Sequence, residues 1–179
     1  LYHVPKDTTI QFLNTEKPNV ILFILESWSS DLVGALGGDT GITPNFDKLC
    51  SEGLVFSNLY ATGTTSDMGM PSILSAFPGQ PVTSIITQPA KYRHLPCINK
   101  EFKNHGYHTS YYFGGQLSYG NIKSYVYYNG FDNIFEEEDF DDPAFIHGKL
   151  GIHDEFMMRT HLSDMNKEQT PFFSILFTL

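Results

Sequence analysis

The stretch NVILFILES, residues 19–27, decides the fold class. Its centre, Val20–Leu25, is a continuous run of β-branched and large apolar residues that stops abruptly at Glu26. A short run of this kind is typical of a strand that is buried on both faces, as in a parallel sheet covered by helices. We therefore predict a central buried strand here, with a carboxylate at its carboxyl end.

Further apolar runs alternate with segments that carry helix signals. Pro44 and Gly53 flank a predicted helix over residues 44–52, because proline suits a first helical turn and glycine ends a helix. One further predicted helix follows the break at residues 63–67 and runs to about Ala76, and the others span residues 97–105, 121–128 and 152–165. The other predicted strands are Leu54–Tyr60, Tyr107–Phe113 and Phe172–Phe177. This alternation predicts an α/β protein with a three-layer α/β/α architecture and a mainly parallel central sheet.

Composition narrows the function classes. The chain has 179 residues, 41% of them hydrophobic, which is enough for one domain with its own core. A net charge of −9, from 11 basic and 20 acidic residues, disfavours nucleic acid as a partner. The acidic run Glu136–Asp142 is interpreted as a solvated loop rather than a calcium site. Cys50 and Cys97 lack metal-ligand spacing and are expected to be buried thiols, with a single disulfide as the alternative.

Two groups of residues at the predicted ends of elements could carry chemistry. Glu26 follows a buried strand, where a charge is costly unless a cation or another partner compensates it. Thr64, Thr65 and Ser66 stand at a helix start, where unpaired N–H groups and the helix dipole favour an oxyanion. A hydroxyl there becomes a nucleophile if a base or a metal activates it. From the residues alone, two other interpretations remain open. Glu26 could cap a helix or reach solvent, and the hydroxyl residues could be ordinary helix N-caps.

The order of three motifs resembles the opening of the alkaline phosphatase/sulfatase superfamily. These motifs are the strand ending at Glu26, TPNFDKL at residues 43–49, and GLVFSNLYA at residues 53–61. The resemblance covers roughly residues 18–179 and is nearest to the lipoteichoic acid synthase and phosphoglycerol transferase branch, and more distantly to lipid A phosphoethanolamine transferases. It implies an alkaline phosphatase-like domain over residues 19–179, truncated at its C-terminal end, with residues 1–18 as a linker or lead-in.

The resemblance also assigns roles. It implies that Glu26 is a metal ligand, and that Ser66 is the nucleophile and a second metal ligand. Matching the lipoteichoic acid synthase pattern instead would assign both roles to Thr65. Asn121 and Lys123 fall in a segment that contacts the substrate in the family, where either side chain could hold a phosphate. The implied cofactor is a divalent cation, Mn²⁺, Mg²⁺ or Zn²⁺.

The implied activity is phosphotransfer from a phosphodiester, with phosphoglycerol or a similar group passing from a phospholipid through a covalent Ser or Thr intermediate. A phosphodiester or sulfate-ester hydrolase and a catalytically degenerate binding domain remain as alternatives. Sulfate-ester hydrolysis is disfavoured because, in residues 69–73 (GMPSI), Gly69 stands where the C/S-x-P-x-R motif that sulfatases modify has Cys or Ser, and Ile73 stands where it has Arg.

Family members are usually membrane-anchored enzymes whose catalytic domain lies outside the cytoplasmic membrane, and the resemblance implies this periplasmic or extracellular location here. The family completes its metal site with an Asp-His pair and contacts the substrate with a further His, and the resemblance places all of these beyond Leu179. We therefore expect the isolated 179 residues to bind metal weakly and to be inactive.

Overall fold

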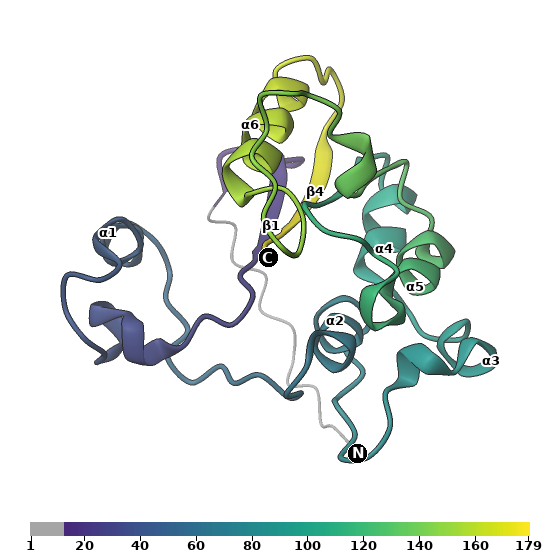
Figure 1. Cartoon of the computed structure of the whole chain (residues 1–179), viewed down its shortest axis with the longest axis horizontal. Coiled ribbons are helices and arrows are strands. Elements are labelled where there is room, and N and C mark those ends of the chain that lie inside the picture. The colour runs from purple at the N-terminus through teal and green to yellow at the C-terminus, as the bar shows by residue number, and fades with distance from the viewer. Residues whose placement is uncertain (1–12) are drawn as a thin grey trace.

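A computed structural model describes residues 13–179 and shows a parallel sheet with helices on both faces (Figure 1). The strands are β1 Val20–Ile24, β2 His108–Phe113, β3 Asn133–Phe135 and β4 Phe172–Phe177. The helices are α1 Pro44–Glu52, α2 Ser66–Ser75, α3 Pro89–Tyr92, α4 Ile98–Asn104, α5 Ile122–Asn129 and α6 Asp154–Met165. Short 3₁₀ turns cover Ser30–Leu32, Gly34–Leu36, Ile85–Thr87, Tyr119–Asn121 and Glu137–Asp139.

The sheet has the order β1-β4-β2-β3, and all three strand pairs are parallel. In the pairing of β1 with β4, Ile24 lies opposite Phe177. The residues just after both strands therefore meet at the same edge of the sheet, where ligands bind in open α/β folds. The predicted α/β/α class with a mainly parallel sheet is confirmed.

Alternating side chains of the strands form two cores. On one face, Phe173, Ile175 and Phe177 of β4 pack with residues of α2, α3, α4 and α5. On the other face, Leu176 of β4 packs with Met157 of α6. The two clusters bury β4 completely, and each sheet face acquires its own helical layer. No helix of the described residues has both the length and the apolar character that a membrane crossing requires.

The prediction that β1 is a central strand buried on both faces is wrong. β1 is an edge strand that pairs only with β4 among the described residues, and its burial alternates. Val20, Leu22 and Ile24 pack against the larger core, whereas Ile21 and Phe23 on the α6 side are 37% and 50% exposed. The second core beneath α6 forms around Tyr112 and Leu176 of β2 and β4, so its packing leaves the outer face of β1 in contact with solvent.

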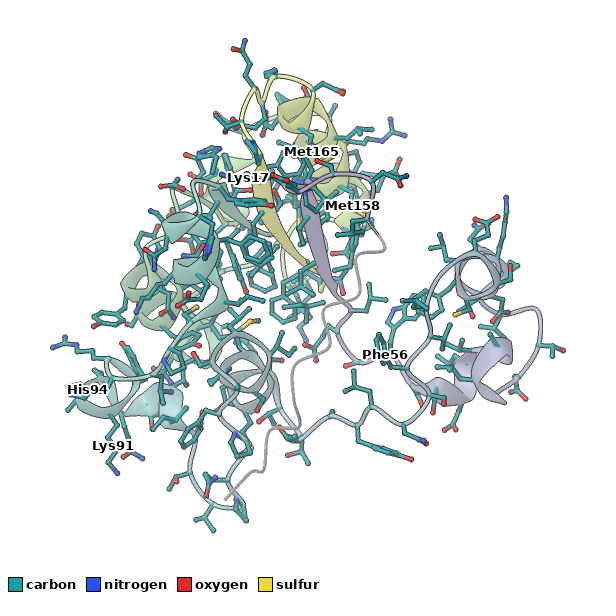
Figure 2. All side chains as sticks on the ribbon, turned by 180° about the vertical axis from the view of Figure 1, so that it is seen from behind. Lys17, Phe56, Lys91, His94, Met158 and Met165 are labelled. Carbon is teal, nitrogen blue, oxygen red and sulfur yellow. The ribbon has the colours of Figure 1, made fainter. Side chains whose placement is uncertain are left out.

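The predicted strand Leu54–Tyr60 is also wrong. These residues form no strand and connect α1 to the body of the molecule, and Phe56 projects from this segment (Figure 2). Leu54 and Leu59 are 77% and 81% exposed. A strand needs a hydrogen-bonded neighbour, and no described strand runs beside this segment, so its apolar composition alone does not make it a strand. Cys50 and Cys97 are free thiols; Cys97 is buried and Cys50 is half-buried.

Candidate active site

Glu26 and Ser66 meet at the carboxyl edge of the sheet. Ser66 Oγ donates a hydrogen bond of 2.8 Å to Glu26 Oε2, although 40 positions separate the two residues. Both side chains are half-buried, so the pair is reachable from solvent without being fully hydrated. The expected convergence of a strand-end carboxylate and a helix-start hydroxyl is therefore present in the structure.

Ser66 is the first residue of α2, and Thr65 occupies the N-cap position before it. Thr65 has extended backbone angles that suit an N-cap, but its side chain makes no capping hydrogen bond. The Ser66 hydroxyl turns to Glu26 instead of to the helix backbone. The helix-capping interpretation therefore does not account for these two hydroxyls, and of the two only Ser66 contacts Glu26.

The loop before α2 lies tightly against the helix. A Cβ atom at Gly63 would lie 2.5 Å from Met68 Cβ, which is too close for any residue other than glycine. Thr62 Oγ1 donates to Ser72 Oγ over 2.7 Å and accepts from the Gly79 N–H over 3.3 Å. These contacts fix the direction from which the chain enters α2, and with it the position of the Ser66 side chain.

The turn after β1 positions Glu26. Ser27 has a φ of +57°, a left-handed conformation that is unfavourable for a residue with a Cβ. Ser27 Oγ donates to Glu26 Oε1 over 3.2 Å, so each carboxylate oxygen accepts one hydroxyl hydrogen. The Glu26 N–H donates to Thr178 Oγ1 over 2.8 Å. The carboxylate and its backbone are thus held by contacts from three separate segments.

Sequence reasoning missed two residues at this edge, Thr178 and Asp154. Thr178 follows β4, and Asp154 Oδ1 at the start of α6 accepts the N–H of Leu179 over 2.9 Å. Burial raises the pKa of the Asp154 carboxyl, and the Leu179 N–H and His153 partly oppose this shift. The signal in the sequence was positional only: Thr178 follows a predicted core strand, where site residues of α/β proteins gather.

Asn121 and Lys123 lie on the neighbouring segment. Asn121 is exposed at the N-cap of α5, and the preceding Gly120 is close enough to the first turn of α2 that a Cβ there would lie 3.8 Å from Asp67 Cβ. Lys123 forms ion pairs with the buried Glu136 and, over 3.9 Å, with Glu138. The hydrogen bond to Glu136 raises the pKa of Lys123. The charge of Lys123 is therefore already matched by carboxylates.

A polar cavity of about 790 Å³ lies beside this ion pair. Lys123, Glu136 and Glu138 line it together with further acidic residues, which are Glu137, Asp141 and Asp142. The solvated acidic loop expected from the sequence is therefore only partly so, because Glu136 is buried and its Oε2 also accepts the Leu117 N–H over 3.1 Å. A phosphate placed in this cavity would face several carboxylates.

The donor atoms of Glu26 and Ser66 fit two positions of a divalent-cation shell. Oxygens bound to one ion at ~2.0–2.2 Å lie on the order of 3 Å apart, close to the 2.8 Å between Oε2 and Oγ. Across residues 13–179, no group of three or more His, Cys, Asp and Glu side chains is arranged to hold a metal. Glu26 and Ser66 therefore fit a cation as part of a larger ligand set.

The sequence of nearly the whole chain matches a known protein family. The model of the Sulfatase family matches residues 18–179, which include both cores and the Glu26–Ser66 pair. The chain belongs to the Sulfatase family. A curated member, the Delta 4,5-hexuronate-2-O-sulfatase of Bacteroides thetaiotaomicron, is 26% identical over 130 residues, which are 70% of this chain and 27% of the relative.

Solved structures place this Sulfatase-family chain in the alkaline phosphatase superfamily. A protein of that superfamily from Vibrio parahaemolyticus has a TM-score of 0.82 and 33% identity, over 92% of this chain and 41% of its own. The lipoteichoic acid synthase LtaP from Listeria monocytogenes has a TM-score of 0.75 and 21% identity, over 90% of this chain and 40% of its own. The chain spans less than half the length of each.

A third similar structure is the C-terminal periplasmic domain of EptC from Escherichia coli in complex with Zn. Its TM-score is 0.65 with 17% identity, over 91% of this chain and 43% of its own. This superfamily is generally metal-dependent, and it includes both transferases and sulfatases. The resemblance to the superfamily predicted from the sequence is confirmed.

Proposed function

We propose that the full-length protein is a metal-dependent phosphotransferase that moves phosphoglycerol or a similar group from a lipid phosphodiester to an acceptor hydroxyl. One observation carries the proposal: the Ser66 hydroxyl at the start of α2 donates directly to the carboxylate of Glu26. An activated hydroxyl at a helix N-terminus combines a nucleophile with a site that favours an anion. Similarity to LtaP in fold supports the choice of substrate class.

In the proposed first half-reaction, Ser66 Oγ attacks the phosphorus of the phosphodiester. A bond forms between Oγ and phosphorus, the bond from phosphorus to the leaving alcohol breaks, and that alcohol oxygen takes up a proton. The Oγ proton already points at Glu26 Oε2, which leaves the lone pairs of Oγ free for the attack. In the second half-reaction an acceptor hydroxyl attacks the same phosphorus, the bond between phosphorus and Ser66 Oγ breaks, and Oγ takes up the proton that the acceptor hydroxyl loses.

Glu26 and Ser66 would hold the cation together with further ligands. When bound, a divalent ion supplies positive charge that lowers the pKa of the Ser66 hydroxyl and neutralises phosphate oxygens. The backbone N–H groups of the first turn of α2 would face the phosphate group of the bound substrate. Thr65 is the alternative nucleophile. Asn121 remains a proposed substrate contact. The proposed role of Lys123 is to hold the segment that contains Asn121 in place through its ion pair with Glu136.

A sulfate-ester hydrolase is the second candidate, because curated relatives such as the hexuronate sulfatase are sulfatases. Gly69 and Ile73 stand where the sulfatase motif requires Cys or Ser and Arg, which favours phosphotransfer. We further propose that the domain works outside the cytoplasmic membrane in a membrane-anchored protein, as the periplasmic location of the EptC domain suggests.

A substrate comparison tests the proposal. Full-length protein is incubated with labelled phosphatidylglycerol, phosphatidylethanolamine or an aryl sulfate, in the presence of Mn²⁺, Mg²⁺ or Zn²⁺ and with EDTA as a control. We expect release of diacylglycerol from a phospholipid, dependent on the cation, with the sulfate ester left intact. Faster release of sulfate than of diacylglycerol would replace the proposal with the hydrolase.

A further inference from the structure

Thr178 contacts the turn that carries Glu26 through two hydrogen bonds. The Thr178 N–H donates to the carbonyl of Ile24 over 3.0 Å, which extends the β1–β4 pairing by one residue. Thr178 Oγ1 accepts the Glu26 N–H over 2.8 Å. Thr178 is 5% exposed, so its hydroxyl makes this bond away from competing water. A buried N–H that loses its acceptor costs more than a solvated one, because no water replaces the bond.

The Glu26 turn needs such a contact. Ser27 adopts its left-handed conformation directly after Glu26, so the chain turns where the carboxylate must point at Ser66. Strained backbone of this kind persists only where surrounding contacts fix it. The Thr178 hydroxyl fixes Glu26, the residue before the strained Ser27, and Asp154 at the start of α6 in turn accepts the N–H of Leu179. The end of β4 is thus anchored to α6 on one side and to the Glu26 turn on the other.

We infer that Thr178 is a positioning residue of the reaction, whose hydroxyl sets the backbone at Glu26 and so the direction of its carboxylate toward Ser66. The inference rests on the proposed function for the roles of Glu26 and Ser66. Valine has the shape of threonine and cannot accept the Glu26 N–H, whereas serine keeps the hydroxyl and loses only the methyl group. The Thr178→Val and Thr178→Ser variants therefore separate the hydrogen bond from packing.

The test uses full-length protein and three readouts: hydrogen exchange of the Glu26 amide, Mn²⁺ affinity by calorimetry, and phospholipid turnover. Thr160→Val is the matched control, because Thr160 Oγ1 donates over 3.0 Å to Phe156 O within α6 and does not contact the Glu26 turn. We expect Thr178→Val to speed Glu26 exchange and to lower both Mn²⁺ affinity and kcat by about 10- to 100-fold, with KM nearly unchanged. Thr178→Ser should keep the Glu26 exchange rate, the Mn²⁺ affinity and the kcat close to those of wild type.

Each outcome bears on a different claim. Thr178→Val with Glu26 exchange and Mn²⁺ affinity equal to those of Thr160→Val would overturn the positioning role, as would a Thr178→Ser variant as impaired as Thr178→Val. A wild-type protein that turns over no phospholipid would overturn the proposed function instead. In that case exchange at the Glu26 amide and Mn²⁺ affinity still decide whether Thr178 positions Glu26.

Discussion

Ser66 Oγ lies 2.8 Å from Glu26 Oε2, which places a helix-start hydroxyl and a strand-end carboxylate in direct contact across 40 positions of sequence. β1 delivers the carboxylate and α2 delivers the hydroxyl, and the parallel sheet brings both to one edge. Helix capping does not explain the hydroxyls at this helix start, because Thr65 makes no capping hydrogen bond and the Ser66 hydroxyl donates to Glu26. The predictions below follow from this arrangement.

Removal of the Ser66 hydroxyl should abolish activity and leave the fold intact. We expect Ser66→Ala to lower kcat by about 10³-fold or more, while Thr65→Val, which removes a hydroxyl that makes no hydrogen bond to Glu26, stays within about tenfold of wild type. Turnover of phospholipid by full-length protein measures both, with thermal melting as the control for folding. The reverse order of the two variants would make Thr65 the nucleophile.

Neutralising Glu26 should weaken cation binding. The Glu26→Gln side chain keeps its size but loses the charge that attracts a divalent ion, so Mn²⁺ affinity in full-length protein should fall by at least about 10-fold. Glu52→Gln is the control, because Glu52 is exposed and pairs only over 3.8 Å with Lys48. The 179 residues alone should bind Mn²⁺ weakly in calorimetry, since the described residues 13–179 bring together only Glu26 and Ser66 where catalytic sites use about three ligands. Tight, stoichiometric binding by the isolated chain would contradict the ligand assignment.

Two phenylalanines on different strands test the layer arrangement. Phe173 on β4 is 1% exposed and stacks on Phe102, so Phe173→Ala should lower the free energy of unfolding by about 3–5 kcal/mol. Phe23 on β1 is 50% exposed, so Phe23→Ala should cost only about 1 kcal/mol. Urea unfolding of the two variants measures the difference. Similar losses would mean that the outer face of β1 is covered in solution.

His161 should make stability depend on pH. Burial lowers the pKa of His161 below its ordinary value of 6.5, and Asp164 only partly opposes this. The unfolded chain then binds a proton near pH 6.5 that the folded chain does not, so stability is complete above this pH and falls as the pH drops below it. His161→Phe, which keeps a ring against Tyr112, should flatten this dependence of stability on pH. His94→Gln is the control, because His94 is exposed (Figure 2) and its replacement should leave the dependence unchanged. Urea midpoints between pH 5 and pH 8 show whether wild type and His161→Phe diverge; parallel curves would refute the prediction.

Local signals predicted every described α-helix except the short α3. Pro44 and Gly53 bound α1 at the expected residues, because helix ends are set by short-range backbone chemistry. The strands were harder, because an apolar run does not name its partner. Leu54–Tyr60 resembles a strand in composition and has no neighbour to pair with, and the three-residue β3 beside the acidic run carries too little pattern to be recognised.

The site was predictable in part for a similar reason. Glu26 and Ser66 each follow a recognisable element boundary, and the rule that ligands gather at the carboxyl ends of parallel strands brings the two together. Thr178 and Asp154 act through backbone N–H groups of other segments, and those contacts depend on the β1–β4 register and on where α6 starts. The sequence does not specify either. The pairing of Lys123 with Glu136 was hidden likewise, because it joins two segments through tertiary packing.

The central claim is that Ser66 carries the transferred group, and covalent trapping measures this most directly. Full-length protein is incubated with phosphatidylglycerol and Mn²⁺ without an acceptor, quenched in acid, digested and mapped by tandem mass spectrometry. The account predicts a phosphoglyceryl group on the Ser66 hydroxyl, absent with EDTA and absent in Ser66→Ala. A modified Thr65, or diacylglycerol release with no covalent adduct at any residue, would contradict it.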